Sequence, residues 1–537
     1  MRRGIMIRSN IILFGLLLFL TACTHHKQES QDIRIKANSE SLIGSIENGI
    51  SIFRGVPFAK PPIGDLRWRA PRKHIPRLGD QHAKQFAPAC MQDEYLTDWY
   101  RDVIASFGGD VDEAPAPRQV SEDCLYLNVW TPMTDPSANL PVMVYIYGGN
   151  NLSGWTYEPN YLGHELAKKD VVVVSIAYRQ GIFGAFVNPE IADQEGEDNS
   201  GNFFLLDLIA GLHWIQENIH SFGGDPANVT VFGESAGAAN IGYLSVSPLA
   251  RNLFKRAIKQ SGGFEIHHDY ANAYEEEKEL GAGFAKMLGV STLAELRGKP
   301  AEEVHAQAMK YYGDSSYNAK RKNFFAIVDD HVMPDTPARM IAQGQIHLAD
   351  YLIGSNADEN LMYTPEKVTE KDVYQYIEDW FPTQNFRSVK DTISFLVNRR
   401  DQLAFLDDSV DYSCPIQILA RAINRHLSNK VYVYYFSRVR EHDTGKYIGA
   451  YHGAELPYVF GTHDDWLPTN TDDLNLTDQI MTYWTNFARV GDPNGIGLPR
   501  WEPYGKQKKP VLNLGNKVAM REVPHKLLCD LFHDPTI

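Results

Sequence analysis

The stretch VTVFGESAGAAN at 229–240 sets a serine between two glycines, after a β-branched run and before small helix-forming residues. This order predicts a strand, a sharp turn with Ser235 at its apex, and a helix that starts near Ala236. Glycines suit positions Gly233 and Gly237, because a Cβ would clash where strand and helix pass closely. Ser235 would then be an exposed nucleophile, with the Ala236 N–H placed where negative charge develops.

The segments around this turn alternate between strands and helices. Short β-branched runs predict buried strands at 142–147, 171–178 and 229–232. Later strands are expected at 254–261, 351–356 and 431–437, separated by helical stretches. Apolar side chains spaced three and four residues apart predict helices over 202–220, 373–380 and 416–426. Such alternation implies an α/β fold, in which a large and mostly parallel central sheet is flanked by helices. We expect a single large domain over 41–537.

Several ordered stretches resemble the type-B carboxylesterase and cholinesterase family of α/β-hydrolases. They are FRGVPFAKPPIGDLRWRAP from 53, SEDCLYLNVWTP from 121, YIYGGNNLSG from 145, the serine-containing stretch 201–237, GSNADEN from 354 and YHGAELPYVFG from 451. The resemblance covers nearly all of 41–537 and implies the α/β-hydrolase fold. It also implies a serine carboxylic ester hydrolase that uses no cofactor and takes a small or medium carboxylic ester.

A serine hydroxyl is a poor nucleophile at neutral pH, so it needs a base and a carboxylate that orients the base. The chain has 18 histidines, and composition favours none of them. The resemblance points to His452 as the base and Glu359 as the orienting acid, in the chain order Ser235, Glu359, His452. Asp358 is the alternative to Glu359. Glu234 is expected to be a buried carboxylate beside the nucleophile.

The oxyanion hole of such enzymes consists of backbone donors, and the resemblance assigns the N–H groups of Gly149, Asn150 and Ala236. The loop reads YGGNN at 147–151. It departs from the common triple glycine, with Asn150 in third place and Asn151 where an aromatic residue is usual. Asparagine tolerates a left-handed backbone, so the donor can survive the change. The effect of both asparagines on the pocket shape stays open.

The chain contains five cysteines, at positions 23, 90, 124, 414 and 529. The resemblance implies disulfides between Cys90 and Cys124 and between Cys414 and Cys529, and four free thiols are the alternative. No C-x-x-C or H-E-x-x-H spacing occurs, so the sequence predicts no metal site.

The first 22 residues have the pattern of an export signal, with three arginines ahead of an apolar stretch at 11–20 that is too short for a comfortable membrane span. The sequence LTAC, ending at Cys23, resembles the bacterial lipobox, in which the cysteine is acylated. An ordinary signal peptide is the alternative. We expect a polar tether over 23–40 and a location in the bacterial cell envelope, lipid-anchored or periplasmic, or secretion. Thr24 resembles the outer-membrane sorting class.

The formal net charge of −15 disfavours nucleic acid as a partner, because a polyanion would be repelled. Contact with a membrane is expected through the lipid anchor only. Two other functions stay open: a catalytically silent cholinesterase-like adhesion or binding module, and a specialised ester or amide hydrolase. The presence of serine, glutamate and histidine at the expected positions favours an enzyme. No residue pattern indicates acyl length, alcohol preference or oligomeric state.

Overall fold

The computed structural model describes residues 31–37, 39–194, 196–266, 271–313, 324–427, 429–441, 448–505 and 510–532. The predicted export segment and Cys23 lie outside the described residues.

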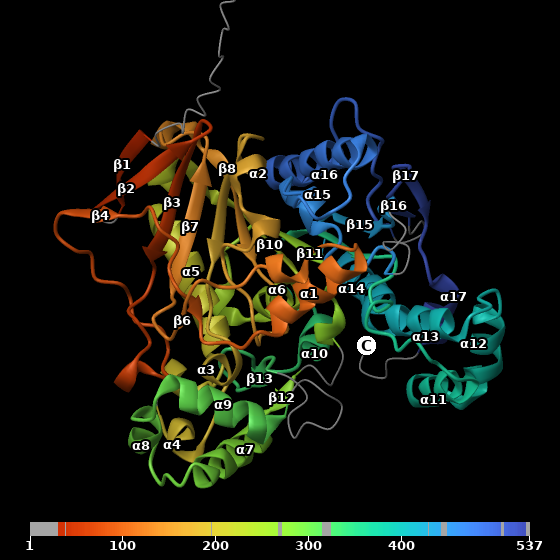
Figure 1. The fold of residues 1–537 in the computed structure, drawn as a ribbon, viewed down its shortest axis with the longest axis horizontal. Helices are drawn as coiled ribbons and strands as arrows, with labels where there is room; N and C mark the ends of the chain where they lie inside the picture. The colour runs from red at the N-terminus through yellow and green to blue at the C-terminus, as the bar shows by residue number, and fades with distance from the viewer. Residues whose placement is uncertain are drawn as a thin grey trace, which may run out of the picture.

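A 13-stranded sheet runs through the molecule (Figure 1). In spatial order its strands are β1 (Gln31–Ala37), β2 (Glu40–Glu47), β3 (Ile50–Pro57), β7 (Tyr126–Thr131), β9 (Val172–Ile176), β8 (Leu140–Ile146), β10 (Gly224–Glu234), β11 (Arg256–Gln260), β14 (Asp350–Asn356), β15 (Val431–Phe436), β16 (Pro510–Leu514) and β17 (Ala519–Glu522), with β4 (Asp80–His82) beside β2. Pairing is parallel from β9 to β16 and antiparallel from β1 to β9 and between β16 and β17. Two short pairs, β5 (Ala89–Cys90) with β6 (Val120–Ser121) and β12 (Asn272–Ala273) with β13 (Ile327–Val328), lie outside this sheet.

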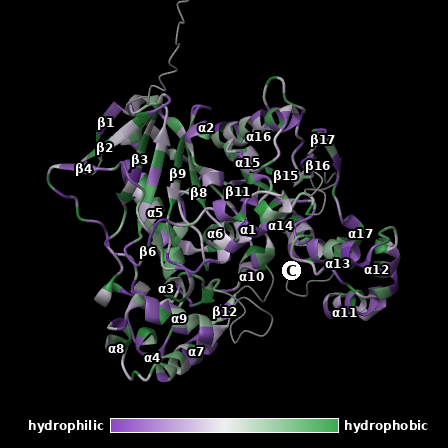
Figure 2. Ribbon diagram, viewed as in Figure 1, coloured by the Kyte–Doolittle hydropathy of each residue, from purple (hydrophilic) through white to green (hydrophobic). Residues whose placement is uncertain are grey.

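The mostly parallel central sheet predicted from the sequence is confirmed. Each of the six predicted strands is present, as β8, β9, β10, β11, β14 and β15. Every residue of β9, β11 and β15 is buried. Burial on both faces explains why β9 and β15 read as nearly continuous apolar runs rather than alternating ones. Strand β11 is buried although it carries Arg256, Lys259 and Gln260. Green strands mark this apolar interior in Figure 2.

Helices flank the sheet. Helices α5 (Phe203–Asn218), α11 (Glu370–Trp380) and α14 (Cys414–His426) correspond to the three predicted segments. The others are α1 (Tyr95–Ser106), α2 (His164–Ala167), α3 (Gly181–Gly184), α4 (Pro189–Ala192), α6 (Ala236–Val246), α7 (Tyr274–Met287), α8 (Leu293–Arg297), α9 (Ala301–Tyr312), α10 (Pro337–Ala342), α12 (Phe386–Ile393), α13 (Arg399–Asp408), α15 (Leu456–Phe460), α16 (Thr471–Val490) and α17 (Lys526–Leu531). Helices α5 and α6 pack against each other and β10, whereas α2, α15 and α16 gather in a separate layer (Figure 1). Within the described ranges, no helix has the length and apolar character that crossing a bilayer requires.

The tether predicted over 23–40 is wrong for residues 31–37, which form strand β1 and pair along their whole length with β2. The sequence carried a signal for this strand. Ile33, Ile35 and Ala37 alternate with polar residues, and this period of two turns one side of an edge strand toward the core. Ile35 and Ala37 are buried.

Candidate active site

The turn between β10 and α6 has the predicted form, although the strand continues to Glu234. Ser235 has φ 54° and ψ −126°, a conformation that L-residues rarely adopt. Its N–H donates to the Gln260 carbonyl on β11 over 2.9 Å. A Cβ on Gly233 or on Gly237 would lie 2.5 or 2.0 Å from the Ile146 carbonyl oxygen of β8. Both glycines are therefore required by the close passage of β8.

His452 and Glu359 meet as predicted, although 93 residues separate them. Because a carboxylate only accepts, His452 Nδ1–H donates to Glu359 Oε2, over 2.7 Å. Glu359 is fully buried, and its other oxygen accepts the Asn356 N–H at the end of β14 over 2.7 Å. The two bonds hold the carboxylate in one orientation and direct Nε2 of the imidazole away from it.

Asp358, the alternative to Glu359, does not contact the imidazole. Its carboxylate accepts the Ala450 N–H over 2.9 Å, two residues before His452. Asp358 therefore holds the loop that carries the histidine. Adjacent acidic residues thus have different contacts, because successive side chains leave the turn after β14 in different directions.

Glu234 has a contact that the sequence did not indicate. It is buried, and its Oε1 lies 3.2 Å from His452 Nε2, the nitrogen that would serve Ser235. Among the described residues, no hydrogen bond joins the Ser235 hydroxyl to the imidazole, which bonds to Glu359 through Nδ1. In the arrangement observed, Nε2 faces the Glu234 carboxylate.

The charges around His452 perturb its protonation. Desolvation lowers the pKa of His452, but the charge of Glu234, the hydrogen bond that His452 donates to Glu359 and the charge of Glu455 outweigh it and raise this pKa to about 9. Desolvation raises the pKa of Glu234, partly offset by the imidazolium charge. Both groups therefore hold their protons more tightly than usual: the pKa of His452 is raised mainly by the neighbouring carboxylates, and the pKa of Glu234 is raised by its burial.

Of the residues assigned to the oxyanion hole, Ala236 is the first residue of α6, and Gly149 and Asn150 lie in the loop after β8. Gly149 has φ 90°, Asn150 φ 60° and Asn151 φ 55°. The left-handed conformation expected for Asn150 is thus present. In the described part of the chain, the N–H groups of Gly149 and Asn150 donate to no protein acceptor. Gly149 and Asn150 line the same pocket as Ser235 and His452.

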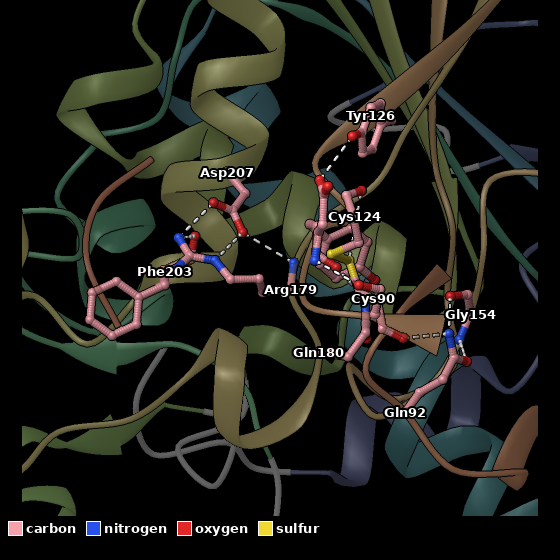
Figure 3. Close-up of a disulfide and its surroundings, with 12 residues drawn as sticks. Cys90, Gln92, Cys124, Tyr126, Gly154, Arg179, Gln180, Phe203 and Asp207 are labelled. Atoms are coloured by element: carbon pink, nitrogen blue, oxygen red, sulfur yellow. Dashed lines mark hydrogen bonds and ion pairs between the residues drawn. A yellow bond between two sulfur atoms is a disulfide. The ribbon is translucent and has the colours of Figure 1, made fainter. Parts of the chain in front are cut away.

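The far end of this loop is fastened to the segment after Cys90. Gly154 N–H donates to Gln92 Oε1 over 2.7 Å, and Gln92 Nε2 donates to the Gly154 carbonyl over 2.9 Å (Figure 3). Cys90 forms the predicted disulfide with Cys124, which lies beside this pair in the same view. The predicted disulfide between Cys414 and Cys529 is also present, and it joins α14 to α17.

A pocket of about 200 Å³ is lined by Ser235, His452, Glu234, Gly149 and Asn150. Aromatic side chains dominate its wall: Tyr95, Trp99, Tyr100, Tyr145, Tyr161, Phe264, Phe325, Tyr363 and Tyr412. Three acidic residues also line it, namely Glu158, Glu234 and Asp411, and no lysine or arginine of the described ranges does. Over those ranges, no group of three or more histidine, cysteine, aspartate or glutamate side chains is arranged to hold a metal ion.

Comparisons with known proteins show the family to which the chain belongs. The model of the carboxylesterase family matches residues 34–532. A medium-chain fatty acyl-CoA hydrolase precursor from Anas platyrhynchos is 33% identical over 95% of this chain and 93% of its own length. Carboxylesterase 1D from Rattus norvegicus is 32% identical over 93% and 92%. A fumonisin B1 esterase from Sphingopyxis macrogoltabida is 30% identical over 96% and 92%.

Solved structures of esterases share the fold. A PNB esterase has a TM-score of 0.80 at 29% identity, covering 93% of this chain and 99% of the esterase. A carboxylesterase from Geobacillus stearothermophilus at pH 6.2 has a TM-score of 0.79 at 28% identity, covering 93% and 100%. The chain belongs to the carboxylesterase family and has the α/β-hydrolase fold.

Proposed function

We propose that the chain hydrolyses carboxylic esters through an acyl-enzyme on Ser235. The Ser235 oxygen attacks the ester carbonyl carbon while His452 Nε2 takes its proton, and Glu359 balances the imidazolium. The carbonyl oxygen becomes an oxyanion that Gly149, Asn150 and Ala236 stabilise through their N–H groups. His452 gives its proton to the departing alcohol, and water then cleaves the acyl-enzyme by the same steps.

One observation carries the proposal: the buried bond between Glu359 and His452 ends at a pocket that also holds the strained Ser235. The position of Nε2 opposite Glu234 suits a protonated imidazole. An imidazolium Nε2–H is attracted to a carboxylate, whereas a neutral imidazole presents a lone pair there. The lone pair is repelled by Glu234 and attracts the Ser235 hydroxyl, so the neutral form is the reactive one.

The pocket supports a small or medium ester as substrate. Its volume of about 200 Å³ is below the roughly 300–1,000 Å³ of drug-sized ligand sites. Aromatic walls suit an apolar acyl or alcohol group. A more specialised ester is the second candidate, because one relative is named a fumonisin B1 esterase.

We also propose export and acylation of Cys23. The arginines, the short apolar stretch and the LTAC sequence support this location. Strand β1 begins at Gln31, so the seven residues after Cys23 would connect an anchor to the folded domain.

The test is a panel of p-nitrophenyl esters of increasing acyl length, followed by esters of increasing alcohol size and by fumonisin B1. The wild-type protein should hydrolyse short acyl esters and be labelled by a fluorophosphonate, and Ser235→Ala should lose both. A folded Ser235→Ala protein that keeps the activity would refute the mechanism. A wild-type protein that is inert and unlabelled would instead indicate a binding module.

A further inference from the structure

We propose that the side chains of Asn151 and Asn240 position the two halves of the oxyanion hole relative to each other, an inference that rests on the function proposed above. The donors come from two elements: Gly149 and Asn150 from the loop after β8, and Ala236 from α6. Among the hydrogen bonds of the described residues, none joins the main chain of 148–152 to that of α6. The pairing of β8 with β10 and the close approach of Gly237 to the Ile146 carbonyl align the starts of the two elements. Beyond Tyr147, side chains fasten the loop to α6.

The two amides face each other across that gap. Asn240 Nδ2 donates to Asn151 Oδ1 over 2.9 Å, and Asn151 Nδ2 donates to Asn240 Oδ1 over 3.3 Å. Both side chains are buried, with exposures of 1% for Asn151 and 0% for Asn240. Asn240 lies four residues after Ala236, on the same face of α6. The pair thus connects the loop to the helix one turn from the Ala236 donor.

The loop depends on outside contacts to keep its shape. Three successive residues, Gly149, Asn150 and Asn151, have positive φ angles, and non-glycine residues in this region persist only when their surroundings hold them. Gln92 holds the far end at Gly154. At the near end, the Asn151 carbonyl accepts the Gly181 N–H over 2.6 Å, and its side chain reaches Asn240.

The Asn151 amide forms a third hydrogen bond, next to a residue of the pocket wall. Asn151 Nδ2 also donates to the Phe324 carbonyl over 3.3 Å, and the next residue, Phe325, lines the pocket. A phenylalanine at position 151 could form neither of the side-chain bonds that Asn151 forms with Asn240 and Phe324. The asparagine therefore does more than tolerate the left-handed backbone: its amide couples loop, helix and wall.

The test changes Asn240, because its helical backbone is unstrained. Asn240→Leu keeps the side-chain size and removes both bonds, and Asn240→Ser is the second variant. We expect kcat/KM on a short p-nitrophenyl ester to fall about 10- to 100-fold, the cost of a small misplacement of catalytic groups. The affinity for a trifluoromethyl ketone should fall by a similar factor, since Ser235 adds to its carbonyl carbon, its proton passes to His452 and the carbonyl oxygen becomes an oxyanion. Affinity for the unreacted ester, measured in a Ser235→Ala background, should change less than about twofold.

Asn494 provides a matched control. Its amide forms a similar reciprocal pair with the main chain of Trp501, with Nδ2 to O at 3.0 Å and Trp501 N to Oδ1 at 2.7 Å, and it does not line the pocket. Asn494→Leu should lower the unfolding temperature and leave the ketone affinity unchanged. The inference is overturned if the Asn240 variants, like Asn494→Leu, keep the ketone affinity of the wild-type protein. It is also overturned if neither Asn240→Leu nor Asn240→Ser folds. Residual turnover in Ser235→Ala would instead overturn the proposed function, independently of Asn240.

Discussion

The contact between Glu234 and His452 makes the pH dependence of the reaction a direct test of the site. The perturbation is Glu234→Gln, which keeps the shape of the side chain and removes its charge. At 3.2 Å, Coulomb attraction is worth about 1.3 kcal/mol at a dielectric constant of about 80 and about 5 kcal/mol at about 20. At 1.36 kcal/mol per pKa unit, this corresponds to a shift of about 1 to 4 units. Desolvation raises the pKa of Glu234, so Glu234 is only partly ionised near neutral pH. We therefore expect the pKa of His452 to shift by a value near the lower limit, about 1 unit.

The direction of the shift in the pH profile follows from the role of the imidazole as a general base. A general base must be neutral, and the acid limb of kcat/KM reports the pKa of the free enzyme. The raised pKa of His452, about 9, places this limb of the wild-type protein above the ordinary histidine value. Removing the Glu234 charge favours the neutral imidazole, so the limb should move to lower pH by at least about 1 unit.

The assay is kcat/KM for a short acyl ester between pH 5 and 10, with stability checked at each pH. Glu40→Gln is the matched control, because Glu40 and Glu234 are each 6% exposed but only Glu234 lines the pocket with His452. Glu40→Gln should leave the limb unchanged. A limb that stays in place in Glu234→Gln, or moves to higher pH, would refute the electrostatic coupling inferred from the geometry.

Three further predictions concern the fold and the chain terminus. Replacing Cys414 and Cys529 by alanine opens a crosslink that spans 115 residues, and loop entropy predicts a loss of up to about 5 kcal/mol. Calorimetry should show a lower unfolding temperature, and an unchanged one would contradict the entropic argument. Gly237→Ala places a Cβ 2.0 Å from the Ile146 oxygen, so soluble, active protein should be lost, and a normally active variant would contradict the close approach. Cys23→Ala should abolish incorporation of labelled palmitate in the producing bacterium and release the protein from the membrane fraction, whereas equal labelling would exclude Cys23 as the acylated residue.

Much of the site was predictable from local sequence. The glycines around Ser235 indicate the turn because strand-to-helix sterics act over a few residues. Buried parallel strands reveal themselves by apolar composition, which explains why β8, β9, β10, β14 and β15 were predicted. Strand β1 was missed because one edge strand of seven residues gives a weak alternating pattern beside a polar segment. His452 and Glu359 required a resemblance to a family, since no local pattern distinguishes one histidine among 18.

The tertiary structure alone decided which groups touch. Sequence left Asp358 open as an alternative, and only the packing of the loop at 448–455 shows that Asp358 binds the Ala450 N–H while Glu359 binds His452. The approach of Glu234 to the same imidazole and the pairing of Asn151 with Asn240 join segments that local patterns do not relate. Such contacts depend on how strands and helices stack over tens to hundreds of residues, whereas sequence patterns report the preferences of each element separately.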